Sequence, residues 1–287
     1  MSFIEVRNLK HIYSPNTPFE RLAIENINLD IELGEFIGLI GHTGSGKSTL
    51  IQHLNGLLLP SGGFIKVGDI SITSKSQNLT ELRRRIGLVF QYPEYQLFEE
   101  TVVKDIEFGP KNLGLDEKEV NNRVRKAMEA VGLDYEKYKN RSPFELSGGL
   151  KRRVAIAGVL SMEPEVLILD EPTAGLDPRG RDEILSEIKT IHESREITII
   201  LVSHSMEDVA KIATRLIVMD KGKVLMDDKP RKIFAREEEL KNAGLGVPQI
   251  KSFMNSLKAR GFDVNTDCIT VKEAKNFLEE FLRSRNV

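Results

Sequence analysis

A glycine-rich segment of eight residues, Gly41 to Ser48, constrains the fold of this chain more than any other part of its sequence. It reads Gly-His-Thr-Gly-Ser-Gly-Lys-Ser and fits the phosphate-loop pattern G-x-x-x-x-G-K-S/T. An apolar run, Phe36 to Ile40, precedes it, and helix-compatible apolar positions follow it from Ser48 to Leu57. A buried strand, a tight loop and a helix are the context this pattern requires. The segment therefore predicts a phosphate site on an α/β core.

The residue types in this segment suit a chain of phosphates. Glycines let the backbone curl so that its N–H groups point inward, and the helix that follows adds its positive end. We expect Lys47 to lie against the β- and γ-phosphates and the Ser48 hydroxyl to bind Mg²⁺. The alternative is an ordinary glycine-rich turn, but a chance match in a chain of this length is roughly a 1% event. The predicted nucleotide-binding residues of this part are Gly41, His42, Thr43, Gly44, Ser45, Gly46, Lys47, Ser48 and Thr49.

Two further apolar runs end in polar residues that suit phosphate chemistry. Val166 to Leu169 delivers Asp170 and Glu171, and strand ends are where open α/β sheets hold their ligands. We expect Asp170 to bind Mg²⁺ and Glu171 to polarise the water that attacks the γ-phosphate. The run Ile197 to Val202 is followed by His204, which can reach the γ-phosphate and the water. Adjacent acids after a strand are common, and a lone histidine is usually an ordinary residue, as we expect for His11, His53 and His192.

A second anion-binding turn is predicted at Ser147, Gly148 and Gly149, at the start of a helix that runs to about Met162. The first loop already supplies a complete phosphate cradle. We therefore interpret the second as serving a nucleotide held by another subunit, which gives a head-to-tail pair with two ATP molecules between the copies. The alternative, a serine N-cap followed by flexible glycines, leaves the paired glycines unexplained.

The order of apolar patterns predicts one large domain with a small extension. Short strands occupy residues 1–35, where Ile27, Leu29, Ile31 and Leu33 alternate with polar residues. Residues from about 92 to 160 read as helical, including a helix capped at Asp116, and continuous apolar strands between helices predict a parallel sheet covered on both faces. We expect a nucleotide-binding domain at residues 1–240 and a helical extension at residues 241–287. The extension is predicted to hold two amphipathic helices, one with Ile250, Phe253, Met254 and Leu257 aligned, and one opened by a Thr270–Glu273 capping box with Ala274, Phe277, Leu278, Phe281 and Leu282 aligned.

Composition excludes several other classes of protein. Lysine and arginine total 41 against 43 acidic residues, so no overall charge favours nucleic acid. The single cysteine, Cys268, excludes an internal disulfide. Apolar runs stop after about six residues where a membrane helix needs about 20, and Met1 to Lys10 lacks the pattern of a secretion signal. Any membrane role is therefore expected to be peripheral.

Together these motifs resemble the ABC ATPase family over about residues 1–235. The resemblance rests on the phosphate loop, Gln91 after an apolar strand, LSGG at 146–149, ILDEP at 168–172 and a D-loop at 174–177. It implies a phosphate-loop α/β fold with a mostly parallel core sheet, an N-terminal antiparallel β subdomain and an inserted helical subdomain. It also implies that ATP and Mg²⁺ are bound, with Lys47, Gln91, Glu171 and His204 in the catalytic set and Gln91 also at the metal. By the same resemblance Asp177 makes a cross-subunit contact, and Tyr13 stacks on adenine. Leu150 stands where the family usually has glutamine, and we expect a modest kinetic effect.

Two stretches, Phe90 to Phe98 and Arg152 to Leu160, resemble those of energy-coupling factor transporter ATPases. Such proteins pair with an identical or related ATPase at the cytoplasmic face of the membrane. They dock on a transmembrane coupling subunit and power uptake of vitamins or transition-metal ions through a separate substrate-binding membrane protein. Tyr92, Tyr95, Leu97 and Phe98 are expected to form a docking surface or to pack within the helical subdomain. The basic clusters at 83–85 and 151–153 are expected to be solvated helix faces, the alternative being contacts with anionic lipid or a partner. Alternatives are the ATPase of another ABC transporter and a soluble ABC ATPase such as a cluster-assembly factor.

Overall fold

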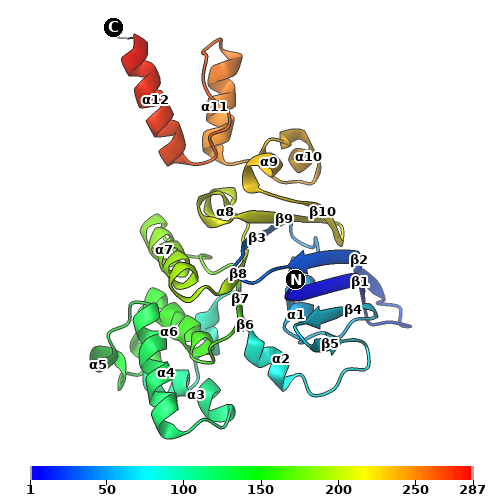
Figure 1. The fold of residues 1–287 in the computed structure, drawn as a ribbon, viewed down its shortest axis with the longest axis vertical. Helices are drawn as coiled ribbons and strands as arrows, with labels where there is room; N and C mark the ends of the chain where they lie inside the picture. Colours follow the sequence, from blue (N-terminus) through cyan, green and yellow to red (C-terminus); the bar gives the residue numbers. More distant parts are fainter. Residues whose placement is uncertain (1, 286–287) are drawn as a thin grey trace.

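The computed structural model describes residues 2–285, which form two β-sheets, a helical subdomain and a C-terminal pair of helices (Figure 1). The first sheet has the order β2-β1-β4-β5, and its neighbouring strands are antiparallel. Alternation in β2 buries Ile27, Leu29 and Ile31, but Leu33, predicted to continue the pattern, lies beyond the strand and is exposed. The strands are β1 (Ile4–Tyr13), β2 (Arg21–Ile31), β4 (Gly62–Val67) and β5 (Ile70–Ile72).

The second sheet has six strands in the order β10-β9-β3-β8-β7-β6. All its pairings are parallel except that of β10 with β9. Successive side chains of β3 point to opposite faces, so Phe36 and Ile40 join the core under the helices, while Ile37 and Leu39 join the core shared with the antiparallel sheet. The prediction of a mostly parallel sheet covered on both faces is confirmed. The strands are β3 (Phe36–Ile40), β6 (Ile86–Val89), β7 (Val166–Asp170), β8 (Thr198–Val202), β9 (Arg215–Asp220) and β10 (Lys223–Asp228).

The helical subdomain lies between β6 and β7 in the chain, as predicted. Asp116 caps its longest helix by accepting a hydrogen bond from the backbone N–H of Glu119 at 2.9 Å. The predicted apolar face of that helix is fully buried, which includes Val120, Val124 and Met128. The elements are η1 (Pro93–Gln96), α3 (Val102–Asn112), α4 (Glu117–Ala130), α5 (Tyr135–Tyr138), η2 (Pro143–Glu145) and α6 (Gly148–Leu160). The helices outside this subdomain and before the extension are α1 (Lys47–Leu54), α2 (Thr80–Arg85), α7 (Pro178–Arg195), α8 (Met206–Ile212), α9 (Pro230–Phe234) and α10 (Glu237–Asn242).

The last two helices, α11 (Gln249–Ala259) and α12 (Val271–Arg285), project together from one end of the molecule in Figure 1. They share a small core of their own, formed by Met254, Val264, Cys268 and Ala274. The predicted capping box is present, because Thr270 and Glu273 each accept a hydrogen bond from the other's backbone N–H. The predicted apolar faces are only partly buried, since Phe253 and Leu282 are exposed. The boundary at residue 240 stays a prediction. Within residues 2–285, no helix is both long and apolar enough to cross a bilayer.

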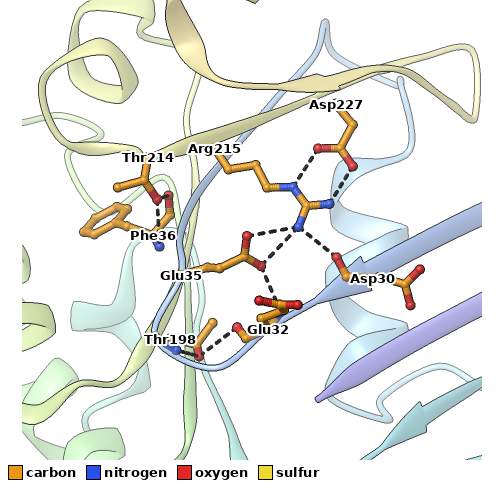
Figure 2. Close-up of polar contacts among 9 residues, drawn as sticks. Asp30, Glu32, Glu35, Phe36, Thr198, Thr214, Arg215 and Asp227 are labelled. Atoms are coloured by element: carbon orange, nitrogen blue, oxygen red, sulfur yellow. Dashed lines mark hydrogen bonds and ion pairs between the residues drawn. The ribbon is translucent and has the colours of Figure 1, made fainter. Parts of the chain in front are cut away.

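A partly buried ion cluster around Arg215 joins the two sheets (Figure 2). The guanidinium makes a bidentate pair with Asp227 on β10, with N–O distances of 2.7 and 2.6 Å. Its remaining nitrogen donates to the backbone carbonyl of Asp30 on β2 at 2.8 Å and to the carboxylate of Glu35 at 3.1 Å. These contacts keep the pKa of Arg215 above its usual value, chiefly through Asp227. The antiparallel sheet is thereby fixed to the edge of the parallel one.

Substituting Arg215→Ala is expected to lower the free energy of unfolding by about 2 to 4 kcal/mol, because two partly buried carboxylates lose their partner. Urea denaturation of parent and variant measures this difference. Arg236→Ala is the control, since Arg236 pairs with Glu239 on an exposed helix surface and such pairs contribute little. Equal effects of the two substitutions would contradict the role assigned to the cluster.

Candidate nucleotide site

The carboxyl ends of three parallel strands meet at one edge of the central sheet. Because β3, β8 and β7 are direct neighbours, the residues that follow them come together there. They line a pocket of about 730 Å³. The structure brings together many of the predicted site residues in its wall, namely Tyr13, Thr43, Gly44, Gly46, Lys47, Ser48, Thr49, Gln91, Asp170, Glu171 and His204.

The glycine-rich loop curls tightly between β3 and α1, and two of its glycines are required by the backbone. Gly44 and Gly46 have left-handed φ angles of 82° and 105°. A Cβ on Gly41 would lie 2.4 Å from the carbonyl oxygen of Met219, and one on Gly46 would lie 2.7 Å from Ile24. The loop therefore cannot carry larger side chains here. The Ser45 hydroxyl is buried and has no partner among the described residues, which fits a loop shaped to contact a ligand.

Lys47 and His42 take different positions around this loop. The ammonium of Lys47 donates to the carbonyl oxygens of Gly41 at 2.6 Å and His42 at 3.1 Å, so it lies folded against the loop. Burial lowers the pKa of Lys47, and the nearby carboxylates of Glu171 and Asp170 oppose that effect. The His42 ring points elsewhere, with Nε2 2.9 Å from Asp220. Of His42, only the backbone is thus left to face a phosphate.

The two acids predicted from the end of β7 differ in environment. Burial raises the pKa of both carboxyl groups, and the pKa of Glu171 reaches about 7. The neighbouring Asp170 adds to the rise at Glu171, whereas the backbone N–H of His204 opposes it. Glu171 also has a left-handed backbone, with φ 51°, held by a hydrogen bond from its N–H to the carbonyl oxygen of Val202 at 3.0 Å. A carboxylate that titrates near neutral pH is suited to exchange a proton with a reacting water.

His204 lies beside Glu171 at the end of β8. Its Nε2 is 3.3 Å from Glu171 Oε1, but the contact lacks hydrogen-bond alignment, and that oxygen has no hydrogen-bond partner among the described residues. The His204 ring is about half exposed to the pocket, and burial lowers its pKa. A buried acceptor oxygen next to an exposed imidazole leaves space for a bound water or phosphate oxygen. The roles of these residues in catalysis stay predictions.

Tyr13 is held at the pocket wall by a pair of buried histidines. Its hydroxyl lies 3.2 Å from Thr49 Oγ1, and its ring packs edge-on against His11 at 4.5 Å. Nδ1 of His53 is 2.7 Å from the carbonyl oxygen of Thr49, and its Nε2 is 3.1 Å from Nδ1 of His11. Because a carbonyl only accepts, His53 carries its proton on Nδ1, and its Nε2 accepts from His11. The network is complete only while His53 is neutral, because its Nε2 must accept from His11.

Seven predicted binding residues do not line this pocket: Gly41, His42 and Ser45 belong to the glycine-rich loop itself, and four others lie elsewhere in the chain. Ser147 and Gly148 are exposed at the start of α6, and a Cβ on Gly148 or Gly149 would meet no atom within 4 Å. Asp177 is also exposed, and it caps α7 by accepting from the N–H of Gly180 at 2.8 Å. None of the four lines the pocket that holds Lys47. Nothing within the described chain explains the paired glycines.

Of the predicted docking residues, Leu97 lines a groove of about 450 Å³ between the helical subdomain and the parallel sheet. Tyr92, Tyr95 and Phe98 are exposed, and Phe98 packs edge-on against Phe108 of α3 at 4.9 Å. Leu97 is buried, so the alternative of packing within the subdomain holds for that residue. The groove is lined by apolar residues that include Leu57, Leu88, Phe90, Phe108, Val159 and Met162.

One expectation about charge is wrong. The basic cluster at 151–153 was predicted to be a solvated helix face, but the Arg152 side chain is only 2% exposed. It contacts residues 20 and 58 positions away in the chain. Local sequence spacing holds no signal of such distant partners, which is why the prediction failed.

Comparisons with known proteins bear on the same region. The sequence profile of the family described as ABC transporter matches residues 24–174. The energy-coupling factor transporter ATP-binding protein EcfA2 of Clostridium tetani is 60% identical over 282 residues, which is 98% of each chain. The protein of the same name from Clostridioides difficile is 58% identical over 288 residues, which is 100% of each chain.

Two solved structures share the fold. One is cbiO1 from Clostridium perfringens, described as part of the ABC transporter complex cbiONQ; it has a TM-score of 0.75 at 39% identity and covers 88% of this chain and 99% of its own. The other is the ATP-binding cassette MJ0796, a dimer in a post-hydrolysis state bound to ADP and phosphate. It has a TM-score of 0.69 at 29% identity and covers 79% of this chain and 98% of its own.

The histidine pair predicts a loss of stability in acid. Burial lowers the pKa of His53, so the unfolded chain binds a proton near pH 6.5 that the folded chain resists, and stability falls as the pH drops below that value. His53→Asn removes the titrating ring and keeps an N–H for Thr49. We expect urea denaturation to show a smaller loss for the variant than for the parent between about pH 7 and about pH 5. Parallel pH curves would contradict a neutral, buried His53.

Proposed function

This chain belongs to the ABC transporter family of ATPases, and we propose that it is the ATP-hydrolysing subunit of an energy-coupling factor importer. It is a transport-coupled ATPase. The finer assignment is supported by the EcfA2 proteins that are 60% and 58% identical over nearly the whole chain. The observation that carries the chemistry is the grouping of Lys47, Glu171 and His204 in one pocket.

ATP is proposed to bind with its triphosphate along the glycine-rich loop and its adenine against Tyr13. The backbone N–H groups of the loop and the ammonium of Lys47 would hold the β- and γ-phosphates. Arg21 and Lys221 also line the pocket and add positive charge. Tyr13 is already oriented by Thr49 and His11, so little freedom is lost when a flat ring stacks on it.

Mg²⁺ fits the donor set of the same pocket. The Ser48 hydroxyl, the Gln91 amide and the Asp170 carboxylate all line the pocket, and oxygen donors of these kinds are the ligands that Mg²⁺ prefers. When bound, the ion would neutralise negative charge on the triphosphate oxygens. Gln91 also begins the segment that leads to the docking groove. It would therefore connect the bound nucleotide with the membrane partner.

Hydrolysis would proceed by attack of one water on the γ-phosphorus. The new P–O bond forms as the bond to the β-phosphate oxygen breaks, which yields ADP and inorganic phosphate. The proton of the water passes to the Glu171 carboxylate, and His204 holds the water and a γ-phosphate oxygen. General-base assistance of this kind contributes about 10² to 10⁴ in rate. The pKa of Glu171, near 7, suits both acceptance and release of that proton.

The working unit is proposed to be a head-to-tail pair with an identical or related ATPase. Ser147, Gly148 and Gly149 form an exposed helix start with open space around the glycines, so a phosphate of the partner's nucleotide can approach the backbone. Asp177 is exposed as well and would contact the partner. The similar cassette solved as a dimer supports this arrangement.

A transmembrane coupling subunit is the proposed occupant of the groove between the helical subdomain and the sheet. Its apolar lining, which includes the exposed Phe108, suits a short amphipathic segment, and the exposed Phe98 packs against Phe108. The chain would then lie peripherally at the cytoplasmic face of the membrane. ATP closes the pair, closure moves the docked subunit, and hydrolysis reopens it, which drives uptake of a vitamin or a transition-metal ion through a separate membrane protein.

Phe108→Asp is expected to abolish co-purification of the chain with a polytopic partner from detergent-solubilised membranes, because it places a charge in the apolar groove. ATP binding to the purified chain should be unchanged. Phe253→Asp is the matched control, since Phe253 is 49% exposed and Phe108 is 46% exposed, but Phe253 lies on α11. Absence of any polytopic partner for the parent would instead support a soluble ATPase.

A hydrolysis-deficient Glu171→Gln chain should bind ATP and accumulate as a closed pair in size-exclusion chromatography. Adding Gly148→Asp should abolish that pair, because the new carboxylate repels the triphosphate held by the other copy. The affinity of the monomer for ATP and its free energy of unfolding should both stay the same, because a Cβ at position 148 meets no atom within 4 Å in its own chain. Gly246→Asp, at another exposed and unconstrained glycine, is the control. A Gly148→Asp chain that still pairs on ATP would rule out the shared site.

A further inference from the structure

Arg152, on α6, carries a charge that is almost completely buried. Its side chain is 2% exposed, and a charge in that position needs partners within the protein. One terminal nitrogen donates to the carbonyl oxygen of Pro172 at 2.8 Å. The other lies 3.2 and 3.3 Å from the two carboxylate oxygens of Glu94. A single rigid guanidinium therefore joins three segments that lie far apart in the sequence.

Both partners are next to proposed functional residues. Pro172 directly follows Glu171, the proposed base. Glu94 lies on η1, three residues after Gln91, in the segment that leads to Gln96 and Leu97 in the wall of the docking groove. One link between the hydrolytic end of β7 and the docking segment thus runs through the Arg152 side chain.

A second contact joins the same two segments. Tyr92 has a left-handed backbone with φ 56°, and its ring lies 3.8 Å from where a Cβ on Gly175 would stand. Gly175 belongs to the loop that follows Pro172. The backbone of Gly175 is left-handed as well, with φ 74°. The η1 segment therefore packs against the loop beyond β7 independently of Arg152. Movement of η1 is transmitted to that loop at two points.

We propose that Arg152 is a positioning residue that holds Glu171 in place for hydrolysis, and that its hold depends on Glu94 in the docking segment. The inference rests on the proposed function, in which Glu171 is the base and the segment that begins at Gln91 contacts the membrane partner. When the partner displaces η1, Glu94 and Arg152 shift together, because separating them would leave a buried guanidinium without its counter-charge. The carbonyl of Pro172 follows, and with it the backbone of Glu171.

The backbone of Glu171 is the part of the site that needs such support. Its left-handed φ of 51° is uncommon for a residue with a side chain and persists only where the surroundings fix it. On one side its N–H donates to Val202, and on the other its carbonyl oxygen accepts from the N–H of Ala174 at 3.0 Å. Arg152 supplies the anchor between them, at Pro172. Loss of this anchor frees the carboxylate to leave the position that water attack requires.

The test uses Glu94→Gln, which keeps the size of the side chain and removes its charge. The matched control is Glu187→Gln, because Glu187 pairs with Arg153, the next residue of α6, and is 22% exposed while Glu94 is 18% exposed. In the full ATPase complex, we expect Glu94→Gln to lower kcat at least fivefold with KM changed less than twofold. Arg152→Lys, which keeps the charge but loses the planar fork, should lower kcat similarly. Glu187→Gln should leave both constants at the parental value.

A second readout requires no activity. Hydrogen exchange of the ATP-free chain should speed up in the segment from residue 166 to residue 177 in Glu94→Gln and not in Glu187→Gln. Unchanged exchange there, or equal changes in kcat for the two variants, would overturn the proposal. Failure of the proposed function would be seen separately, as a parent complex without ATP hydrolysis or without a membrane partner, and the exchange result would still decide the role of Arg152.

Discussion

The site depends on one constraint, the parallel alignment of β3, β8 and β7 as direct neighbours. Parallel neighbours end at the same edge, so residues more than 120 positions apart, such as Lys47 and Glu171, must meet there. The apolar strands bury both faces of the sheet and leave only their ends free for polar chemistry. Burial at that edge then raises the pKa of Glu171 to about 7. Fold and reactivity thus have a common origin.

Sequence patterns predicted the local parts of this arrangement. The strand Phe36 to Ile40, the glycine-rich loop and the caps at Asp116 and Thr270 all follow from short-range rules of spacing and residue type. Contacts between distant segments could not be read in the same way. The burial of Arg152 is set by Glu94, 58 positions away, and the His11–His53 pair spans 42 positions. Exposure of Leu282 was missed because a helix pattern does not tell how much of its apolar face finds a partner.

The glycines of the chain fall into two kinds. Those at 41 and 46 are required by their own chain, because a Cβ would collide with Met219 or Ile24. At Gly148 and Gly149 a Cβ would meet no atom within 4 Å, and neither residue has a positive φ. The folded chain alone therefore does not require glycine at these two positions. A sequence motif reports both kinds alike. The atoms around each Cα show whether a glycine is required for folding of the chain or for its assembly with a partner.

The Arg215 cluster has a consequence for how nucleotide enters and leaves. Tyr13 and Arg21 lie on the antiparallel sheet, while Lys47 begins α1 and Glu171 directly follows β7 of the parallel sheet, so the two walls of the pocket belong to different layers. The Arg215 guanidinium connects these layers through its hydrogen bonds. Backbone hydrogen bonds from Glu25 to Gly222 and from Gly222 to Ser45 connect them as well. These contacts hold the two walls of the pocket together at their shared edge. ADP is then released through the opening of the pocket, and the rate of release depends on what covers that opening.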